Sequence, residues 1–368
     1  MSLADKKTFN RKQVMEPEKF DKRKMLSYVG DLSQLFGIKE YTLSAGKAKG
    51  VKAFDVNNGS GLEFTILSDR CLDIAGLSFN ATNCSYLSKT GIVGPEYYNE
   101  SGTGFLRSFY GGFLTTCGLR NVGNSCEDNS ESFGLHGRIS NTPAEEVCAV
   151  TGWEDGIPVM NISGSMREAR LFGENLVLHR KISCKYGENK ILIQNKVENL
   201  GFRKEPLMLL FHFNFGYPLL DENAELITST AELKPRDPEA QKGAGNYFVF
   251  QEPTAGYSEQ VFYHNLKTDN HQNTSVALIN KKIELGVALH FNKKQLLNFT
   301  QWKQMGEGEY VLGMEPCNCF VGGRSDASKN ETLEYLDPGE TRVFDLTVEF
   351  FDGIREINSI IRKINKLK

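Results

Sequence analysis

One almost wholly apolar stretch decides the fold, and it reads Leu207-Met208-Leu209-Leu210-Phe211-His212-Phe213-Asn214-Phe215-Gly216-Tyr217-Pro218. His212 and Asn214 interrupt it two residues apart, and residues two apart in a β-strand point to the same face. We therefore expect Met208, Leu210, His212 and Asn214 on one face and the alternating leucines and phenylalanines on the other. A buried imidazole and amide need hydrogen-bond partners or a cavity. Because an imidazole can carry a proton near neutral pH, a cavity here would suit acid–base chemistry. A core histidine bonded to a backbone carbonyl is the alternative.

The composition is that of an ordinary globular protein: 40% of the 368 residues are hydrophobic, 24% are charged and the net charge is −3. Charges of both signs are interspersed without a basic stripe, which argues against a nucleic-acid partner. No apolar run approaches the length of a membrane span, and the N-terminal residues lack the apolar core of a secretory signal. We therefore expect a cytoplasmic protein whose eight scattered cysteines are reduced thiols. They are Cys71, Cys84, Cys117, Cys126, Cys148, Cys184, Cys317 and Cys319.

The chain divides into a long β-rich region between two helical ends. Residues 17–36 carry apolar side chains at helical spacing, and so does the isoleucine-rich tail after residue 353. Between them, short apolar segments alternate with Gly, Asn and Asp turns, and residues 61–67 and 346–350 show the period of two of half-buried antiparallel strands. We expect a helical extension at 1–45, one all-β domain at 46–351 built as a two-sheet sandwich, and a C-terminal helix at 352–368.

Several common cofactor and hydrolase motifs do not occur in the sequence. It contains no Gly-x-x-x-x-Gly-Lys-Ser/Thr phosphate loop, no complete dinucleotide loop, no His-Glu-x-x-His and no Gly-x-Ser-x-Gly. Cys317 and Cys319 are too closely spaced for a zinc knuckle and lack a second pair. We therefore expect neither a metal site nor a cofactor.

Two other segments concentrate polar side chains. In Gly134-Leu135-His136-Gly137-Arg138, the glycines would let His136 approach a ligand closely, and Arg138 could form paired hydrogen bonds to sugar hydroxyls or an anion. A solvated surface turn is the alternative. Glu315 ends an apolar strand just before Pro316, where it is either solvated or tucked into a cavity that raises its pKa toward that of a useful base.

Two weaker clusters complete the set of candidates. Arg70 and Asp73, in Ser-Asp-Arg-Cys-Leu-Asp-Ile, form either an internal ion-pair network or a pair of groups that point at a polar ligand. Gln301 offers hydrogen bonds to hydroxyls, and its neighbour Trp302 suits either stacking on a sugar face or core packing.

An early arginine, then His-Gly, then His-x-Asn and a late strand-end glutamate occur in this order in a β-rich chain. This order resembles that of the aldose 1-epimerases, also called galactose mutarotases. Four phrases resemble a branch of that superfamily known as a domain of unknown function. They are Leu-Ser-Asp-Arg-Cys-Leu-Asp-Ile (67–74), Gly-Leu-His-Gly-Arg-Ile-Ser-Asn-Thr-Pro-Ala (134–144), Phe-Thr-Gln-Trp-Lys (299–303) and Gly-Met-Glu-Pro-Cys-Asn (313–318). The resemblance runs over about residues 60 to 350.

The resemblance implies a galactose mutarotase-like β-supersandwich, with short helices at both termini here, whose concave face binds a pyranose. In that family a late glutamate is the base at the anomeric hydroxyl and a central-strand histidine is the acid at the ring oxygen; the matching positions are Glu315 and His212. An earlier histidine and an arginine hold hydroxyls, matching His136 and Arg70, and Gln301 resembles a further hydroxyl-binding position. The other substrate-binding residues that we expect are Asp73, Arg138 and Asn214.

We therefore predict a cofactor-independent isomerase that interconverts sugar anomers. Glu315 takes the proton from the C1 hydroxyl while protonated His212 donates one to the ring oxygen. The ring opens, the C1–C2 bond rotates, and reclosure from the other face inverts the anomer. The expected partner is a monosaccharide or a modified sugar rather than a nucleic acid or a membrane, and a homodimer stays open.

Two departures from the family pattern concern the substrate. Phe213-Asn214 follows His212 where typical mutarotases have a His-Pro-Tyr-Phe-Asn type of run, and neither Asp221 nor Asp237 matches the family's substrate-binding aspartate well. One alternative is therefore an epimerase or isomerase of an acidic sugar that Arg138 or Arg70 binds. The other is a carbohydrate-binding or sensing protein without turnover, which would not require both Glu315 and His212.

Overall fold

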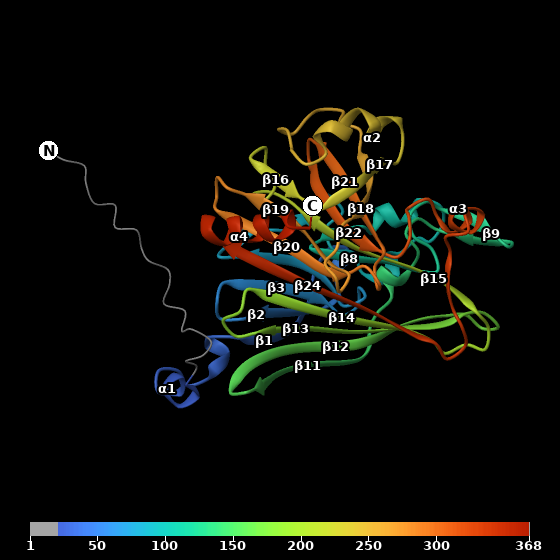
Figure 1. The fold of residues 1–368 in the computed structure, drawn as a ribbon. Helices are drawn as coiled ribbons and strands as arrows, with labels where there is room; N and C mark the ends of the chain where they lie inside the picture. The colour runs from blue at the N-terminus through green and yellow to red at the C-terminus, as the bar shows by residue number, and fades with distance from the viewer. Residues whose placement is uncertain (1–20, 368) are drawn as a thin grey trace.

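The computed structural model describes residues 21–367 and consists mainly of antiparallel β-sheet (Figure 1). The eight-stranded sheet has the order β11 (Glu145–Glu154), β12 (Ile157–Ala169), β13 (Asn175–Lys185), β14 (Lys190–Asn199), β24 (Thr341–Asp352), β20 (Leu285–Asn292), β19 (Asn273–Asn280) and β16 (Ala224–Ile227). The seven-stranded sheet has the order β17 (Thr230–Pro235), β18 (Gln260–Leu266), β21 (Asn298–Gly306), β22 (Glu309–Cys317), β15 (Glu205–Phe215) and β23 (Glu334–Leu336), and β8 (Leu114–Leu119) also pairs with β15.

A smaller sheet and short ribbons complete the β structure. The five-stranded sheet has the order β1 (Gly37–Thr42), β2 (Lys52–Asn57), β3 (Leu62–Leu67), β4 (Asp73–Phe79) and β5 (Thr82–Asn83). The ribbons pair β6 (Tyr86–Leu87) with β7 (Gly111–Gly112) and β9 (Cys126–Asp128) with β10 (Glu131–Phe133). Short helices α2 (Pro238–Gly243) and α3 (Arg324–Lys329) lie in the connections.

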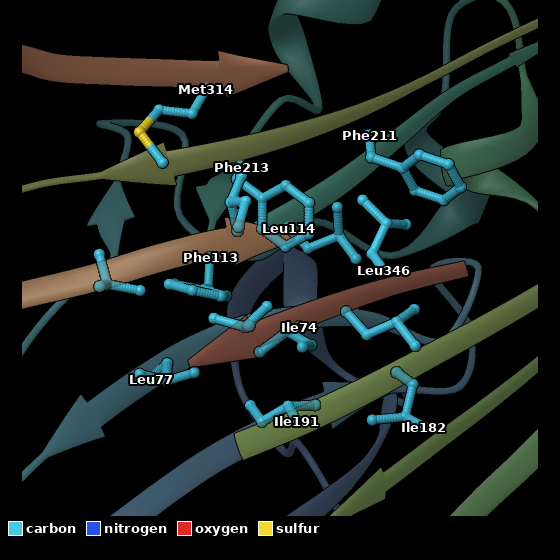
Figure 2. Close-up of a cluster of buried hydrophobic side chains, with 14 of the residues drawn as sticks. Ile74, Leu77, Phe113, Leu114, Ile182, Ile191, Phe211, Phe213, Met314 and Leu346 are labelled. Atoms are coloured by element: carbon cyan, nitrogen blue, oxygen red, sulfur yellow. The ribbon is translucent and has the colours of Figure 1, made fainter. Parts of the chain in front are cut away.

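The main core lies between the sheets. Figure 2 shows Phe211, Phe213 and Met314 of the seven-stranded sheet facing a layer that includes Ile182, Ile191 and Leu346 of the eight-stranded sheet. All six side chains are buried. Each buried side chain of this size contributes about 1.5–3 kcal/mol of transfer free energy, so this interface supplies much of the driving force for folding.

The burial pattern of each strand follows from its place in the sandwich. Along β14, exposed and buried residues alternate, as expected for a strand with one face on the core and one in solvent. All eleven residues of β15 are buried, because both faces of this strand are covered. Leu207, Leu209, Phe211, Phe213 and Phe215 enter the main core, whereas Met208 and Leu210 enter a second apolar cluster on the opposite face. The prediction of the two faces of this strand is confirmed.

The N-terminal helix is much shorter than predicted. Instead of a helix over 17–36, α1 spans Lys22–Leu26, and a separate 3-10 turn covers Leu32–Gln34; residues 17–20 lie outside the described residues. Asp21 caps α1, and the helix ends before Gly30. Leu26 remains exposed, but Val29 is buried and Leu32 and Leu35 pack on the main core, so these side chains are buried by a turn that begins after Asp31 rather than by one continuous helix.

The C-terminal helix α4 (Ile354–Asn365) buries Ile357, Ile360 and Ile364 against β19 and β20. Its apolar side chains have the spacing that the sequence predicted. The expectation of an all-β sandwich with short helices at both ends is therefore confirmed. Among residues 21–367, no helix has both the length and the apolar character needed to cross a bilayer.

Candidate active site

Two neighbouring central strands bring His212 and Glu315 together. The register of β15 with β22 pairs Leu210 with Cys317 and Phe213 with Met314, which places His212 opposite Glu315. Directly opposed residues on neighbouring strands have Cβ atoms about 4.5–5.5 Å apart. The antiparallel ladder therefore juxtaposes an imidazole and a carboxyl that are more than one hundred positions apart in the sequence.

The two groups are close and almost inaccessible. His212 Nε2 lies 3.2 Å from Glu315 Oε1, and the residues are 5% and 2% exposed. Among the described residues, His212 Nδ1 and Glu315 Oε1 have no hydrogen-bond partner, and neither does the buried Oδ1 of the neighbouring Asn214. Buried polar atoms are rarely left unpaired in a folded protein, so three of them on one face indicate a site shaped for a ligand.

Burial sets the protonation state of the pair. Desolvation raises the pKa of Glu315 well above its usual range, and the negative charge of Glu259 raises it further, while Arg236 acts in the opposite direction. Desolvation and the neighbouring His136 lower the pKa of His212 to about 3. Burial therefore favours the protonated form of the carboxyl and the neutral form of the imidazole, whereas the sequence hypothesis began with an ionised pair.

His136 is held beside this pair by the backbone around it. Its amide donates to Gly123 O, its carbonyl accepts from Gly118 N, and its Nδ1 accepts from Gly123 N at 3.3 Å. The last contact leaves the ring proton on Nε2. The His136 and His212 ring centroids are 5.9 Å apart, and burial lowers the pKa of His136 to about 4. His136 is therefore a neutral donor beside the acid–base pair.

The glycine that follows His136 is required by the packing. Gly137 has a φ of 69°, and a Cβ on it would lie 2.3 Å from Gly118 O. From the sequence, the flanking glycines were expected to permit close approach of a ligand. In the structure Gly137 permits close approach of another stretch of backbone, which fixes His136.

Aromatic side chains line the site on the same face. The ring centroids of Phe109 and Trp302 both lie 5.4 Å from that of His212, and Phe105 packs at 5.2 Å on His136. Trp302 is a cross-strand neighbour of Gly313, and it lies on the same face of the sheet as Glu315. A pyranose can stack on such an apolar surface while its hydroxyls reach polar groups.

Hydrogen bonds connect the indole of Trp302 to a series of charged side chains. Its indole Nε1 donates to Glu259 Oε2 at 2.8 Å, Arg236 Nη2 donates to Glu259 Oε1 at 2.9 Å, and Arg236 Nε donates to Asp237. Phe109, Glu259 and Arg236 were not among the site residues expected from the sequence. A polar residue directly before the strand at 260–266 was the available signal for Glu259, but nothing local connects it with Trp302.

Gly313 leaves the space in which these groups meet. A Cβ at this position would lie 2.4 Å from Glu315 Oε1, 2.9 Å from Trp302 Cβ and 3.3 Å from His212 Cε1. Such distances are too short for a real side chain without movement of its neighbours. The absence of a side chain at Gly313 therefore lets Glu315, Trp302 and His212 pack together over its backbone.

Arg70 and Asp73 lie elsewhere and are fully engaged. Arg70 is completely buried and donates to three backbone carbonyls, Ser140 O at 2.7 Å, Val93 O at 2.6 Å and Ser108 O at 3.2 Å. Asp73 accepts from Thr116 and from the buried Arg180, whose Nη1 lies 2.6 Å from Asp73 Oδ1. These hydrogen bonds occupy the donor and acceptor atoms that would otherwise bind a sugar. Both residues therefore stabilise the fold rather than face the site.

Arg138, Asn214 and Gln301 have three different placements. Arg138 follows the His136 segment but pairs with Glu100, and its Nε lies 4.0 Å from Glu168. Asn214 lies on the His212 face; its Nδ2 donates to Gly111 O and His212 O, and its Oδ1 stays unpartnered. Gln301 lies on the opposite face of β21, where it bonds His264 and Tyr247 O.

The donor set of the site is not that of a metal centre. Across residues 21–367 there is no group of three or more His, Cys, Asp or Glu residues arranged to hold a metal ion. All eight cysteines are free, and Cys117, Cys317 and Cys319 lie in the apolar cluster beneath the site. Their burial raises their pKa, which favours the neutral thiol over the thiolate that metals bind.

Solved structures with the same fold support the architecture. A Klebsiella pneumoniae protein, provisionally described as an aldose 1-epimerase, superposes with a TM-score of 0.87 at 24% identity and covers 91% of this chain and 90% of its own. A galactose mutarotase-like protein from Clostridium acetobutylicum gives a TM-score of 0.63 at 14% identity, covering 87% and 99%. Galactose 1-epimerase from Lactobacillus acidophilus gives 0.58 at 15% identity, covering 86% and 99%. At these identities the similarity establishes the galactose mutarotase-like fold.

Comparison with curated proteins finds no match. A family model, described as "Domain of unknown function (DUF4432)", matches residues 48–350. This match includes β15, β22 and all the residues that converge on His212 and Glu315. The chain therefore belongs to the DUF4432 family, whose fold is that of the aldose 1-epimerases and galactose mutarotases.

Proposed function

We propose that this protein is a cofactor-independent aldose 1-epimerase that interconverts the anomers of a monosaccharide. One observation carries the proposal: a buried imidazole and a buried carboxyl lie 3.2 Å apart beside unpartnered polar atoms. Anomer interconversion needs one group that removes a proton from the C1 hydroxyl and one that donates a proton to the ring oxygen. Asn214 and His136 are proposed to bind hydroxyls, and Trp302 and Phe109 to contact the ring.

The proposed proton movements start from the resting pair. Glu315 holds the exchangeable proton, and its transfer to His212 Nε2 across the short gap forms a carboxylate and an imidazolium. Glu315 then removes the C1 hydroxyl proton while His212 protonates the ring oxygen; the C1–O5 bond breaks and the C1 carbonyl forms. Rotation about C1–C2 and the reverse transfers give the other anomer, and the pair ends with the same single proton.

The positions of the cations favour a neutral sugar over an acidic one. Arg70 and Arg138 were the candidates for binding an acidic group, but Arg70 is saturated by carbonyls and Arg138 is paired with Glu100. A third cation near the site, Arg236, already contacts Asp237 and Glu259. A sugar carboxylate would therefore meet more negative than free positive charge at this site.

Anomer exchange measured by NMR across a panel of neutral aldoses tests the proposal. We expect accelerated exchange for at least one aldose, and a loss of about 10²–10⁴-fold in kcat/KM for Glu315→Gln, because amide replacement removes proton transfer at nearly constant shape. His212→Asn should fold normally and lose activity to a similar extent.

The matched control is His264→Gln, which changes a histidine of equal burial on the opposite face of the same sheet. It should leave kcat within about threefold of wild type, since it touches neither reacting group. If no aldose exchanges faster with the protein, or if Glu315→Gln is as active as wild type, the proposed activity is wrong. Binding of a sugar without exchange would identify the carbohydrate-binding alternative.

A further inference from the structure

The candidate site is covered by a surface segment, residues 94–107, which contains two 3-10 turns, Pro95–Tyr97 and Gly104–Arg107. Its outer residues Tyr97 and Leu106 are more than half exposed, whereas Phe105 is 2% exposed and packs on Phe109 and His136. His212 and Glu315 lie beneath this aromatic layer. A ligand can reach them only if some part of the covering layer moves.

Arg70 holds both ends of this segment. Its Nη1 donates to Val93 O, just before the segment, and its Nη2 donates to Ser108 O, just after it. Its Nε donates to Ser140 O, which ties both ends to the loop that follows His136. A planar guanidinium presents these donors in fixed directions, so one side chain sets the separation of the two ends.

The tip of the segment is fastened differently, by contacts with residues 135–138. Leu135 N donates to Gly102 O at 2.9 Å, Tyr98 Oη donates to Gly137 O at 2.9 Å, and Arg138 pairs with Glu100. The side chains of Arg138 and Glu100 are 33% and 41% exposed, so solvent weakens this ion pair. Gly134 makes the close contact feasible, because a Cβ there would lie 1.9 Å from Glu100 O.

The contacts at the ends of the segment and those at its tip differ in how easily they can be broken. The contacts of Arg70 are fully buried, whereas those at the tip are few and partly solvated. The backbone of His136 is bonded to Gly118 and Gly123 rather than to the segment. Lifting the tip would therefore withdraw Tyr98 from the apolar cluster beside the site, while Phe105, whose carbonyl accepts from Ser108, and His136 stay in place.

We propose that residues 94–107 are a lid over the site, that Arg70 is a positioning residue that clamps its two ends, and that Glu100 and Arg138 form the latch at its tip. The role of the lid as the entrance for sugar rests on the proposed function, but the lid itself rests on the contacts above. This assigns to Arg70 and Arg138 roles distinct from the substrate binding expected from sequence.

Buried thiols in the chain allow a direct test. Cys117 and Cys317 share an apolar cluster with Phe105 and Phe109, so their modification by N-ethylmaleimide should follow lid opening. Cys84 and Cys184 lie in the main core, so their modification should follow global unfolding instead. Peptide mass spectrometry of the full chain under native conditions gives the rate at each cysteine.

The test variants are Glu100→Gln and Glu100→Gln with Tyr98→Phe. We expect modification of Cys117 and Cys317 to accelerate about five- to tenfold, with Cys84 and Cys184 unchanged, and amide exchange of 94–107 to accelerate to a similar degree. The control variant is Glu154→Gln, which breaks a comparably exposed ion pair with Lys185 on the distant edge of the eight-stranded sheet and should change none of these rates.

Equal rates in the wild type and both variants would overturn the lid, and so would equal acceleration at all four cysteines. Glu315→Gln, tested for anomer exchange in parallel, addresses the proposed function separately. It removes proton transfer and leaves every contact of the lid intact, so the two proposals can fail independently.

Discussion

At the scale of single residues, two histidines of similar burial show how partners distinguish structure from chemistry. His264 Nδ1 contacts Thr230 Oγ1 at 2.8 Å and its Nε2 contacts Gln301 Oε1 at 3.1 Å, so both ring nitrogens are satisfied. His212 has an unpartnered Nδ1 and faces a carboxyl. Burial alone would have placed both in the core; the unmet hydrogen-bonding capacity of His212 identifies the candidate site.

Glu259 and Arg236 should tune the candidate base in opposite directions. Glu259 raises the pKa of Glu315 and Arg236 lowers it. If the active form of the pair carries one proton, kcat/KM falls at high pH when Glu315 loses that proton. Glu259→Gln should therefore move this alkaline limb to lower pH, and Arg236→Gln should move it to higher pH, in pH profiles of anomer exchange.

A purely structural role for these two residues predicts a different result. Loss of the support behind Trp302 would change KM or kcat at every pH and would leave the midpoint of the alkaline limb in place. Two variants whose midpoints move in the same direction would refute the electrostatic assignment.

At the scale of elements, β21 shows how strand alternation separates function from support. Thr300 and Trp302 face the site, while Gln301 and Lys303 face the other way and hold the connection after α2. Lys303 Nζ donates to Asn246 O and Val249 O, and burial lowers its pKa to about 8. Residues 299–303 thus line the candidate site on one face of the sheet and support the connection after α2 on the other.

Gln301→Ala should therefore reduce stability more than catalysis. It leaves His264 Nε2 and Tyr247 O without partners, and each unpaired buried group costs about 1–3 kcal/mol. We expect urea unfolding to show a loss of about 2–6 kcal/mol for the two groups together, while kcat and KM of the folded protein stay within about threefold of wild type. A large rise in KM at unchanged stability would instead restore the hydroxyl-binding role inferred from the family resemblance.

Sequence reasoning predicted features that depend on local periodicity and missed those that depend on distant partners. The alternation along 207–215 was enough to place His212 and Asn214 on one face, and the isoleucine spacing was enough for α4. The same reasoning could not place Arg70, because its acceptors at 93, 108 and 140 are remote in the chain. The N-terminal helix was predicted too long because a 3-10 turn that follows Asp31 buries Leu32 and Leu35 just as a continuous helix would.

At the scale of the whole molecule, buried neutral histidines make stability depend on pH. Burial lowers the pKa of His264 to about 4, below its unfolded value near 6.5. The unfolded chain then binds more protons between these values, so this residue's contribution is fully present above about pH 6.5 and is lost as the pH falls toward 4. His136 and His212 contribute with the same sign, and the raised pKa of Glu315 contributes with the opposite sign.

His264→Gln isolates one of these contributions. The variant should be less stable than wild type at pH 7, and the difference in unfolding free energy should shrink by about 2 kcal/mol between pH 7 and pH 5, because only the wild type has this proton to take up on unfolding. Urea denaturation at the two pH values measures the difference. A constant difference would mean that folding leaves the pKa of His264 unchanged, and a difference that grows toward pH 5 would mean that folding raises it.

The lack of a side chain at Gly313 has a consequence for other chains of this family. A sequence can keep the glutamate and the histidine and still prevent them from packing against each other. An alanine at the equivalent of 313 would put a methyl group where the two reactive side chains converge. A single methyl group is thus a marker by which a chain that has lost turnover could be recognised from its sequence alone.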